Sequence, residues 1–368
     1  MAATKEKAKE YQRIRHWLEI FGIVLTSAML LAAIPLSTLF YGWAQVITSA
    51  RYGILALYFL FFSVYSMFLF SPVSFYSGFI LEHRYSLSNQ TFSGWLWEWT
   101  KKQLLSFGMM LVLVLLLYAL IWNFRTQWWF FGWAGYALFS LVLGKLFPVL
   151  IVPLFYKYSP ISDDALRKKI EDLGARFGMA IQNVYSLNLS KTTKKANAAF
   201  AGFGKTKRVI LGDTLLSNFT HREIEIVLAH ELGHYKHHDV LKQFVFGTAV
   251  SFAGFWIAKE VLASLASTFR FSGAEDIRAF PILCLVFFIF GLIVSPLGNA
   301  FSRWAEKQAD QFALDALKDK DAFISSMKKL SEINLADPDP HPVIEFIFYD
   351  HPAIAKRIQM AERYSVLK

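Results

Sequence analysis

Residues 220–239 read THREIEIVLAHELGHYKHHD, and a long apolar run, 242–266, follows almost directly. Thr220 and Glu223 have the spacing of a capping box, in which two side chains satisfy free backbone N–H groups at a helix start. His230 and His234 lie four positions apart in the predicted helix, so both imidazoles leave it on one face. The stretch therefore predicts a histidine-bearing helix that adjoins a membrane segment.

The composition extends the membrane prediction to the whole chain. Of 368 residues, 55% are hydrophobic and only 18% are charged, with a mean hydropathy of +0.37. Soluble proteins carry roughly 25% charged residues. Disorder is excluded by the apolar content, and a disulfide scaffold by the single cysteine, Cys284. The net charge of +10 is expected to mark the cytoplasmic face of a membrane protein, so we expect no nucleic-acid partner.

Six stretches are long enough for a helix to cross a hydrocarbon core of about 30 Å, which takes roughly 20 residues. They are 18–40, 54–80, 104–122, 128–152, 242–266 and 279–300. The first is longer than the apolar part of a signal peptide, about 7–15 residues, so we expect it to be retained. The chain then divides into four spans in 1–156, a polar segment in 157–241, two spans in 242–300 and a polar tail in 301–368.

The basic residues predict the orientation, because cytoplasmic loops are enriched in lysine and arginine. The segment before the first span and the segment between the second and third spans are rich in them: Lys5, Lys7, Lys9, Arg13, Arg15, Arg84, Lys101 and Lys102. The alternate loops hold fewer: Arg51, Arg125, Arg270 and Arg278. Both long polar segments are thus expected on the cytoplasmic side, where they can meet.

The polar segments predict a small mixed domain. Residues 162–178 indicate an amphipathic helix with Ser162 as its N-cap. Residues 181–189 and 207–212 are typical of short strands, and 302–318 and 321–334 of helices.

The pattern HExxH at 230–234 predicts a zinc site. Two histidines one helical turn apart offer two nitrogen ligands to a tetrahedral metal, and Glu231 reaches its open position. Zinc lowers the pKa of its bound water to about 7, and a carboxylate there can accept the proton. The sequence therefore indicates a zinc hydrolase.

A third ligand is expected from a later helix. The extended pattern HExxHxxGxxH is excluded, since His237 and Val240 occupy its glycine and third-histidine positions. Glu306 and Asp310 lie one turn apart in SRWAEKQADQFA, residues 302–313. Glu306 is the candidate ligand, and Asp310 the candidate acceptor for the N–H of a ligating histidine.

The chain resembles the Ste24-type membrane zinc metallopeptidases, whose eukaryotic members are the CAAX prenyl protease 1 enzymes. Five blocks carry the resemblance in the same order: SPVSFYSGFILEHRYSLSNQT (71–91), KANAAFAGFGKTKRVILGDTLL (195–216), HELGHYKHHD (230–239), SRWAEKQAD (302–310) and DHPAIAKRI (350–358). It implies a mainly α, polytopic helical membrane protein, for which the apolar stretches above predict about six transmembrane helices. A cytoplasmic, gluzincin-like metallopeptidase domain with a small β-sheet is implied as well.

The resemblance implies that His230, His234 and Glu306 bind one Zn²⁺ per chain, with Glu231 as the catalytic base. It places Asn197 and Ala198 in the edge strand that pairs with an extended substrate. His351 and Arg357 are implied to line the cleft, where they would stabilise a tetrahedral oxyanion or hold the shape of the site.

The resemblance also implies a peptide or protein substrate, either prenylated at a CAAX motif or a misfolded membrane protein, and a lipid bilayer as the environment. The bilayer is a bacterial inner membrane or the endoplasmic reticulum, and the sequence leaves the oligomeric state open. The eukaryotic members are described with seven spans that enclose a large chamber, one span more than the six expected here.

Two alternatives remain at this stage. A site-2-type intramembrane protease would bury HExxH within a span and add an aspartate ligand, but the motif helix carries Arg222, Glu225 and Lys236. A transporter or scaffold with structural zinc would close the site with four protein ligands, and only three candidates are present.

Overall fold

Six long helices form the body of the molecule. The computed structural model describes residues 2–179, 181, 183–201 and 208–365. Within these residues, six helices are long and apolar enough to cross a membrane. They are α1 (Ala2–Ile47), α2 (Arg51–Phe75), α4 (Phe92–Asn123), α5 (Trp128–Leu146), α9 (Asp239–Thr268) and α10 (Phe280–Leu317). The prediction of six spans and of a mainly helical membrane protein is confirmed.

Several of these helices are much longer than a membrane span. At 1.5 Å per residue, α1 with 46 residues reaches roughly 70 Å and α10 with 38 residues roughly 57 Å. The second helix continues through η1 (Tyr76–Ile80) and α3 (Leu81–Arg84), and the fourth through η2 (Phe147–Ile151) and η3 (Val152–Leu154). The predicted boundary between residues 300 and 301 falls inside α10, so one rigid helix joins the membrane body to the polar end.

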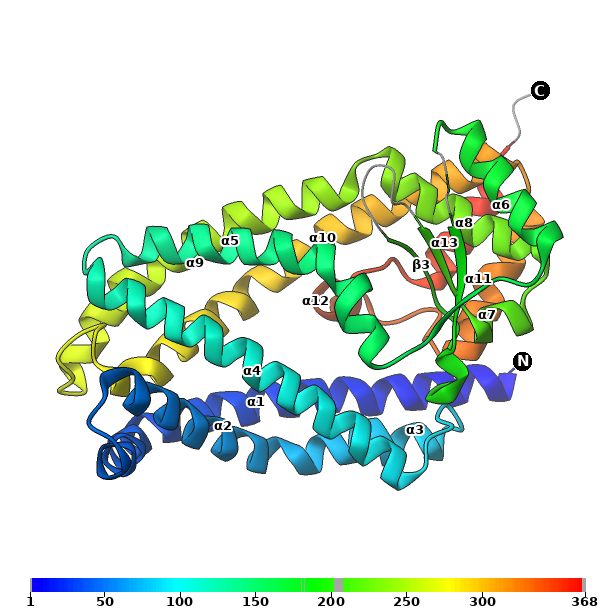
Figure 1. Cartoon of the computed structure of the whole chain (residues 1–368). Helices are drawn as coiled ribbons and strands as arrows, with labels where there is room; N and C mark the ends of the chain where they lie inside the picture. Colours follow the sequence, from blue (N-terminus) through cyan, green and yellow to red (C-terminus); the bar gives the residue numbers. More distant parts are fainter. Residues whose placement is uncertain (1, 180, 182, 202–207, 366–368) are drawn as a thin grey trace.

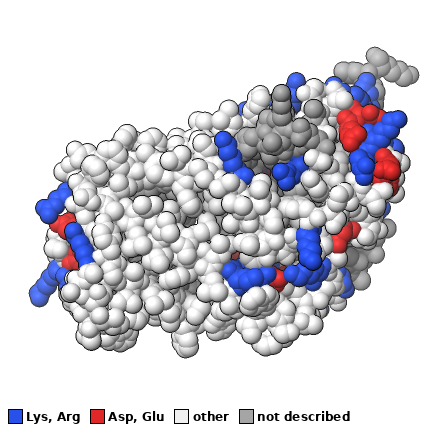
Figure 2. Space-filling model, viewed as in Figure 1, with Lys and Arg blue, Asp and Glu red and all other residues white. Residues whose placement is uncertain are grey.

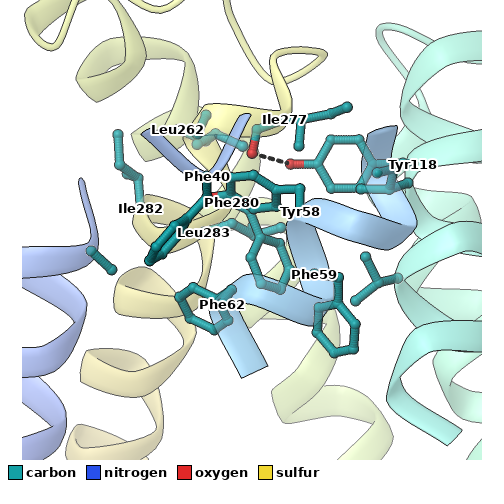
Figure 3. Packing of buried hydrophobic residues seen from close by; sticks show 14 of the residues in the cluster. Phe40, Tyr58, Phe59, Phe62, Tyr118, Leu262, Ile277, Phe280, Ile282 and Leu283 are labelled. Atoms are coloured by element: carbon teal, nitrogen blue, oxygen red, sulfur yellow. Dashed lines mark hydrogen bonds between the residues drawn. The ribbon is translucent and has the colours of Figure 1, made fainter. Parts of the chain in front are cut away.

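The end of the body far from the two termini is closed by an apolar core (Figures 1 and 3). The ring of Phe280 lies 5.2 Å from that of Phe62 and 6.0 Å from that of Phe59, both edge to face. The hydroxyl of Tyr118 donates to the carbonyl of Ile277 (3.4 Å), which fastens α4 to η6 (Ile277–Ala279) (Figure 3).

Between this core and the polar end the long helices pack loosely. None of the described residues between Phe62 and Leu81, or between Val286 and Ala305, is fully buried. Figure 1 shows α4 and α5 spreading apart from their shared turn toward the polar end. The space-filling view has a broad band free of charged side chains between its two charged ends, as a hydrocarbon core requires (Figure 2).

The polar end holds a four-stranded sheet and the shorter helices. The strands are β1 (Tyr158–Pro160), β2 (Asn183–Leu187), β3 (Ala198–Ala201) and β4 (Arg208–Gly212), in the order β1-β2-β4-β3. The central pair β2 and β4 is parallel, and the outer strands are antiparallel to their neighbours. The helices are α6 (Asp164–Arg176), α7 (Asp213–Asn218), α8 (His221–Lys236), α11 (Lys320–Asn334), α12 (Pro342–Phe348) and α13 (Ile354–Arg363), with the short η4 (Leu189–Lys191).

Three sequence predictions are corrected in detail here. The N-cap of α6 is Asp163, whose carboxylate accepts the N–H of Leu166 at 2.8 Å, rather than Ser162. The strand predicted at 181–189 is observed as β2 over 183–187, and the strand predicted at 207–212 is observed as β4 over its described residues, 208–212. Residues 182 and 207 of those predictions lie outside the described residues. The helix predicted at 302–318 is the last part of α10, which continues through Pro296 without ending and joins it to the membrane span before it.

Candidate metal centre

The capping box that opens the HExxH helix is formed. The hydroxyl of Thr220 accepts the N–H of Glu223, and the carboxylate of Glu223 accepts the N–H of Thr220 at 2.8 Å. Ser325 and Lys329 of α11 also donate to this carboxylate, at 2.6 and 2.7 Å. Burial by itself would raise the pKa of Glu223, but these donors lower it below its usual value. The start of α8 is therefore tied to α11 as well as capped.

A glycine lets α8 and α10 approach closely. A methyl group at Gly233 would lie 2.8 Å from the Cα of Ala309 on α10, closer than van der Waals contact allows. Gly233 stands between Glu231 and His234, and Ala309 stands between Glu306 and Asp310. The close approach thus brings the two halves of the predicted site together, although they are far apart in the sequence.

Three side chains converge as the sequence predicted. The Nε2 atoms of His230 and His234 are 3.2 Å apart, and each lies 3.2 Å from a carboxylate oxygen of Glu306. One ligand atom from each of the three lies within 4.8 Å of the others. Oε2 of Glu306 is buried and makes no hydrogen bond. It lies 3.2 Å from Nε2 of His230, while Oε1 lies 3.2 Å from Nε2 of His234. A buried carboxylate between two imidazole nitrogens fits a divalent cation, and three ligands leave one position open, as in catalytic zinc sites.

The electrostatics also favour positive charge at this point. Burial alone would lower the pKa of His230, but the carboxylates of Asp310 and Glu306 raise it to about 9. For His351, Asp350 and Glu306 outweigh burial and raise the pKa to about 10. A metal ion would balance the negative charge of these carboxylates, so His230 and His234, whose Nε2 atoms are 3.2 Å apart, would not both have to be protonated.

Each candidate histidine ligand is oriented from behind by an aspartate. Asp310 lies 2.8 Å from Nδ1 of His230, and Asp239 lies 3.0 Å from Nδ1 of His234. An Nδ1–H held this way leaves the Nε2 lone pair free for a metal. Asp310 was a sequence candidate, whereas Asp239 was missed. Its position just beyond the end of α8, five residues after His234, was the available signal.

Arg357 lies behind the candidate ligands. Its Nε donates to Asp310 at 2.7 Å, and its Nη2 is 3.4 Å from Nδ1 of His230. The side chain is only 9% exposed. This arrangement favours the second of the two roles implied for Arg357, which is to hold the shape of the site.

Glu231 and His351 stand beside the three converging groups. Burial raises the pKa of Glu231, and the neighbouring histidines oppose that rise only in part. His351 is about half exposed; its Nδ1 lies 2.8 Å from Asp350, and its Nε2 lies 3.1 Å from Glu306. A carboxylate with a raised pKa, as in Glu231, is suited to accept a proton beside a metal, and Nε2 of His351 lies next to the same candidate ligand, Glu306.

The predicted substrate strand corresponds to β3, the outermost strand of the described sheet on one side. Ala198 begins β3 opposite Leu211 of β4, and Asn197 lies just before it, with its carbonyl accepting the N–H of Gly212 at 2.9 Å. The side-chain amide of Asn334 accepts the N–H of Ala196 and donates to the carbonyl of the same residue. Among the described strands, β3 pairs on one side only, with β4.

Two family models together match nearly the whole chain. The model for peptidase family M48 matches residues 160–365. The model described as the CAAX prenyl protease N-terminal region with five membrane helices matches residues 2–157. The described part of that segment holds four of the six candidate spans.

Individual proteins give the same picture. An uncharacterized metalloprotease of Bacillus subtilis, YhfN, is 32% identical over 287 residues, which cover 76% of this chain and 66% of that protein. CAAX prenyl protease 1 of Saccharomyces cerevisiae is 28% identical over 81% of this chain and 69% of its own length. The crystal structure of S. mikatae Ste24p is similar over 99% of this chain and 90% of that one, with a TM-score of 0.87 and 26% identity.

Proposed function

This chain belongs to peptidase family M48 and is a multi-pass membrane metalloprotease, and on that premise we propose that it is a zinc endopeptidase of prenylated CAAX-type substrates. The observation that carries the proposal is the convergence of His230, His234 and Glu306. α8 is not among the six candidate spans, and the third converging group is a glutamate. Both features disfavour a site-2-type intramembrane protease.

The metal would be held by His230, His234 and Glu306, one ion per chain. When bound, zinc would acidify a water molecule and polarise the carbonyl of the scissile bond. Asp310 and Asp239 keep the two imidazoles in the tautomer that a metal needs. Three protein ligands leave a position for water and substrate, so a purely structural zinc site in a scaffold or transporter is disfavoured.

The remaining side chains divide the proton transfers and the charge stabilisation. Glu231 takes the proton of the attacking water and returns it to the leaving amine. His351, as the imidazolium, donates a hydrogen bond from Nε2 to the carbonyl oxygen as negative charge develops there, while its Nδ1–H donates to Asp350. Arg357 holds Asp310 in place. The substrate lies extended along β3 near Asn197 and Ala198, where backbone hydrogen bonds fix its register.

The orientation and the substrate class are part of the proposal. The excess of basic residues in the first turns of α1 (Lys5 to Arg15), at the end of α3 (Arg84) and in α4 (Lys101 and Lys102) supports a cytoplasmic location for the catalytic end. The prenyl group is inferred from the CAAX prenyl proteases among the relatives. Relatives from a bacterium and from eukaryotes leave both the inner membrane and the endoplasmic reticulum as possible sites.

The test uses the purified full chain in detergent. Bound zinc is measured, and cleavage of one CAAX peptide is followed with and without its farnesyl group, beside Glu231→Gln. We expect one zinc per chain, faster cleavage of the farnesylated peptide, and no cleavage by a folded, zinc-loaded Glu231→Gln protein. An equally active Glu231→Gln protein would refute the mechanism. Equal rates on both peptides would refute the prenyl preference and favour broader clearance of membrane proteins.

A further inference from the structure

One face of α10 carries polar side chains on successive turns. Asn299, Arg303, Glu306 and Asp310 are spaced four, three and four residues apart, which places them on one face of a helix. Each contacts a different point of the C-terminal segment. Asn299 donates to the carbonyl of Ile347 at 2.6 Å, and Glu306 and Asp310 meet His351 and Arg357. The helix that would supply a metal ligand therefore also anchors the segment that carries His351.

Arg303 fastens the end of the short helix α12. Its Nη1 donates to the carbonyl of Glu345 at 3.0 Å and also to the carbonyl of Tyr349. The last carbonyls of a helix have no partner within it, and a basic side chain can satisfy them. Arg303 thus fixes the point at which the chain leaves α12.

Glu345 fastens the start of the next helix, α13. Its side chain is only 7% exposed, and its carboxylate accepts the N–H of Ala353, the N-cap residue of α13, at 3.0 Å. Lys356, in the first turn of α13, donates to the same carboxylate. A carboxylate at a helix N-terminus is also favoured by the helix dipole. The two anchors therefore hold both ends of a loop of four residues, 349–352.

His351 lies inside this loop. Pro352 restricts its backbone to extended conformations, and Asp350 lies 2.8 Å from Nδ1 of its ring. Its Nε2 then faces Glu306 at 3.1 Å. The ring itself is about half exposed, so packing around it contributes little to its orientation. The position of Nε2 consequently depends on how firmly the two ends of the loop are held.

We propose that Arg303 and Glu345 are positioning residues, which fix loop 349–352 so that Nε2 of His351 reaches the reacting carbonyl oxygen. This inference rests on the proposed function, because it requires that His351 stabilises the reacting carbonyl oxygen during peptide hydrolysis. Within the described part of the chain, neither residue hydrogen-bonds to His230, His234 or Glu306. Arg303 donates to backbone carbonyls, and Glu345 accepts from Ala353 and Lys356.

The test compares Arg303→Lys in the otherwise normal protein and in a His351→Gln background. A lysine keeps the charge but lacks the planar fork that reaches several carbonyls at once. We expect Arg303→Lys to lower kcat about 10-fold, with KM within about 2-fold and zinc content unchanged, since small misplacements of a catalytic group carry such costs. In the His351→Gln background, Arg303→Lys should cause no further loss.

Arg176→Lys is the matched control, because Arg176 of α6 likewise donates to a backbone carbonyl, that of Ala316, at 3.0 Å, but lies outside the loop that carries His351. It should leave kcat unchanged. A readout independent of activity is the imidazole ¹⁵N spectrum of the zinc-loaded chain with labelled histidine, in which His351→Gln identifies the His351 signals. We expect Arg303→Lys and Glu345→Gln to shift or broaden these signals, and Arg176→Lys to leave them in place.

Equal losses from Arg303→Lys in both backgrounds would overturn the inference, as would unchanged His351 signals. The proposed function fails in a different way. In that case Glu231→Gln retains activity, whereas a His351→Gln protein with unchanged kcat would overturn the inference, which depends on a role for His351.

Discussion

Replacing Gly233 by alanine tests whether close packing of α8 on α10 builds the metal site. The added methyl group would lie 2.8 Å from the Cα and 3.2 Å from the Cβ of Ala309. Since carbon atoms pack at about 3.5–4.0 Å, the helices must separate locally by at least roughly 0.7 Å. Both contacts are with backbone or with a side chain that has no rotamer freedom, so no simple rearrangement removes the overlap.

The expected magnitude follows from that displacement. Overpacking of this kind lowers the free energy of unfolding by about 1–3 kcal/mol, and the better helix propensity of alanine raises it by about 1 kcal/mol. The effect on metal binding should be larger, because metal–ligand distances tolerate only about 0.2 Å. We expect zinc affinity to fall about 10- to 100-fold, and the melting temperature to fall by a few degrees at most.

The assay is competition for zinc with a chelator of known affinity, on the full chain in detergent, with melting followed by intrinsic fluorescence. Gly298→Ala is the matched control: it lies on α10, and a methyl group there meets no atom within 4 Å. It should bind zinc normally and melt no lower than the unmodified protein. A Gly233→Ala protein with unchanged zinc affinity would refute the reasoning.

Three further predictions concern the same domain. Asp239→Asn should weaken zinc binding about 10- to 100-fold in the chelator assay, because it loosens the hold on His234, and an unchanged affinity would contradict that role. Removing the metal with a chelator should abolish peptide cleavage and lower the melting temperature, since a bound ion stabilises only the folded state; zinc should restore both, and cleavage by the metal-free protein would contradict a metallopeptidase. The lowered pKa of Glu223 predicts stability that is present above the unfolded-state pKa near 4.3 and is lost as the pH falls through the folded-state pKa. Lys329→Met should lower the melting temperature at pH 7 and flatten this acid dependence, whereas a parallel shift at every pH would contradict it.

The spans and the histidine helix could be predicted because their signals are local. Apolar runs longer than a bilayer is thick allow few alternatives to a membrane helix. The spacing of His230 and His234 fixes their relative direction within one helix. The N-cap of α6 was predicted wrongly because the local sequence offers two good candidates, Ser162 and Asp163. Only the geometry of the first turn of α6 selects Asp163.

Other parts of the site depend on contacts that leave no local signal. Asp239 is near His234 in the sequence, but its contact with that ring depends on the turn between α8 and α9, where His238 adopts a left-handed backbone conformation. Arg303 looks like an ordinary charge on an exposed helix, and its partners are carbonyls of a segment more than forty positions away. Glu345 is likewise unremarkable until the fold buries it.

The sequence by itself determined the six membrane helices, the HExxH helix and the residue types from which a third ligand could be chosen. The tertiary structure alone decided that α8 and α10 come close enough at Gly233 for His230, His234 and Glu306 to meet. It also decided that Arg357 stands behind the site. The physical reason is that helix periodicity acts over a few residues, whereas a metal site needs atoms from distant segments placed to within a few tenths of an ångström.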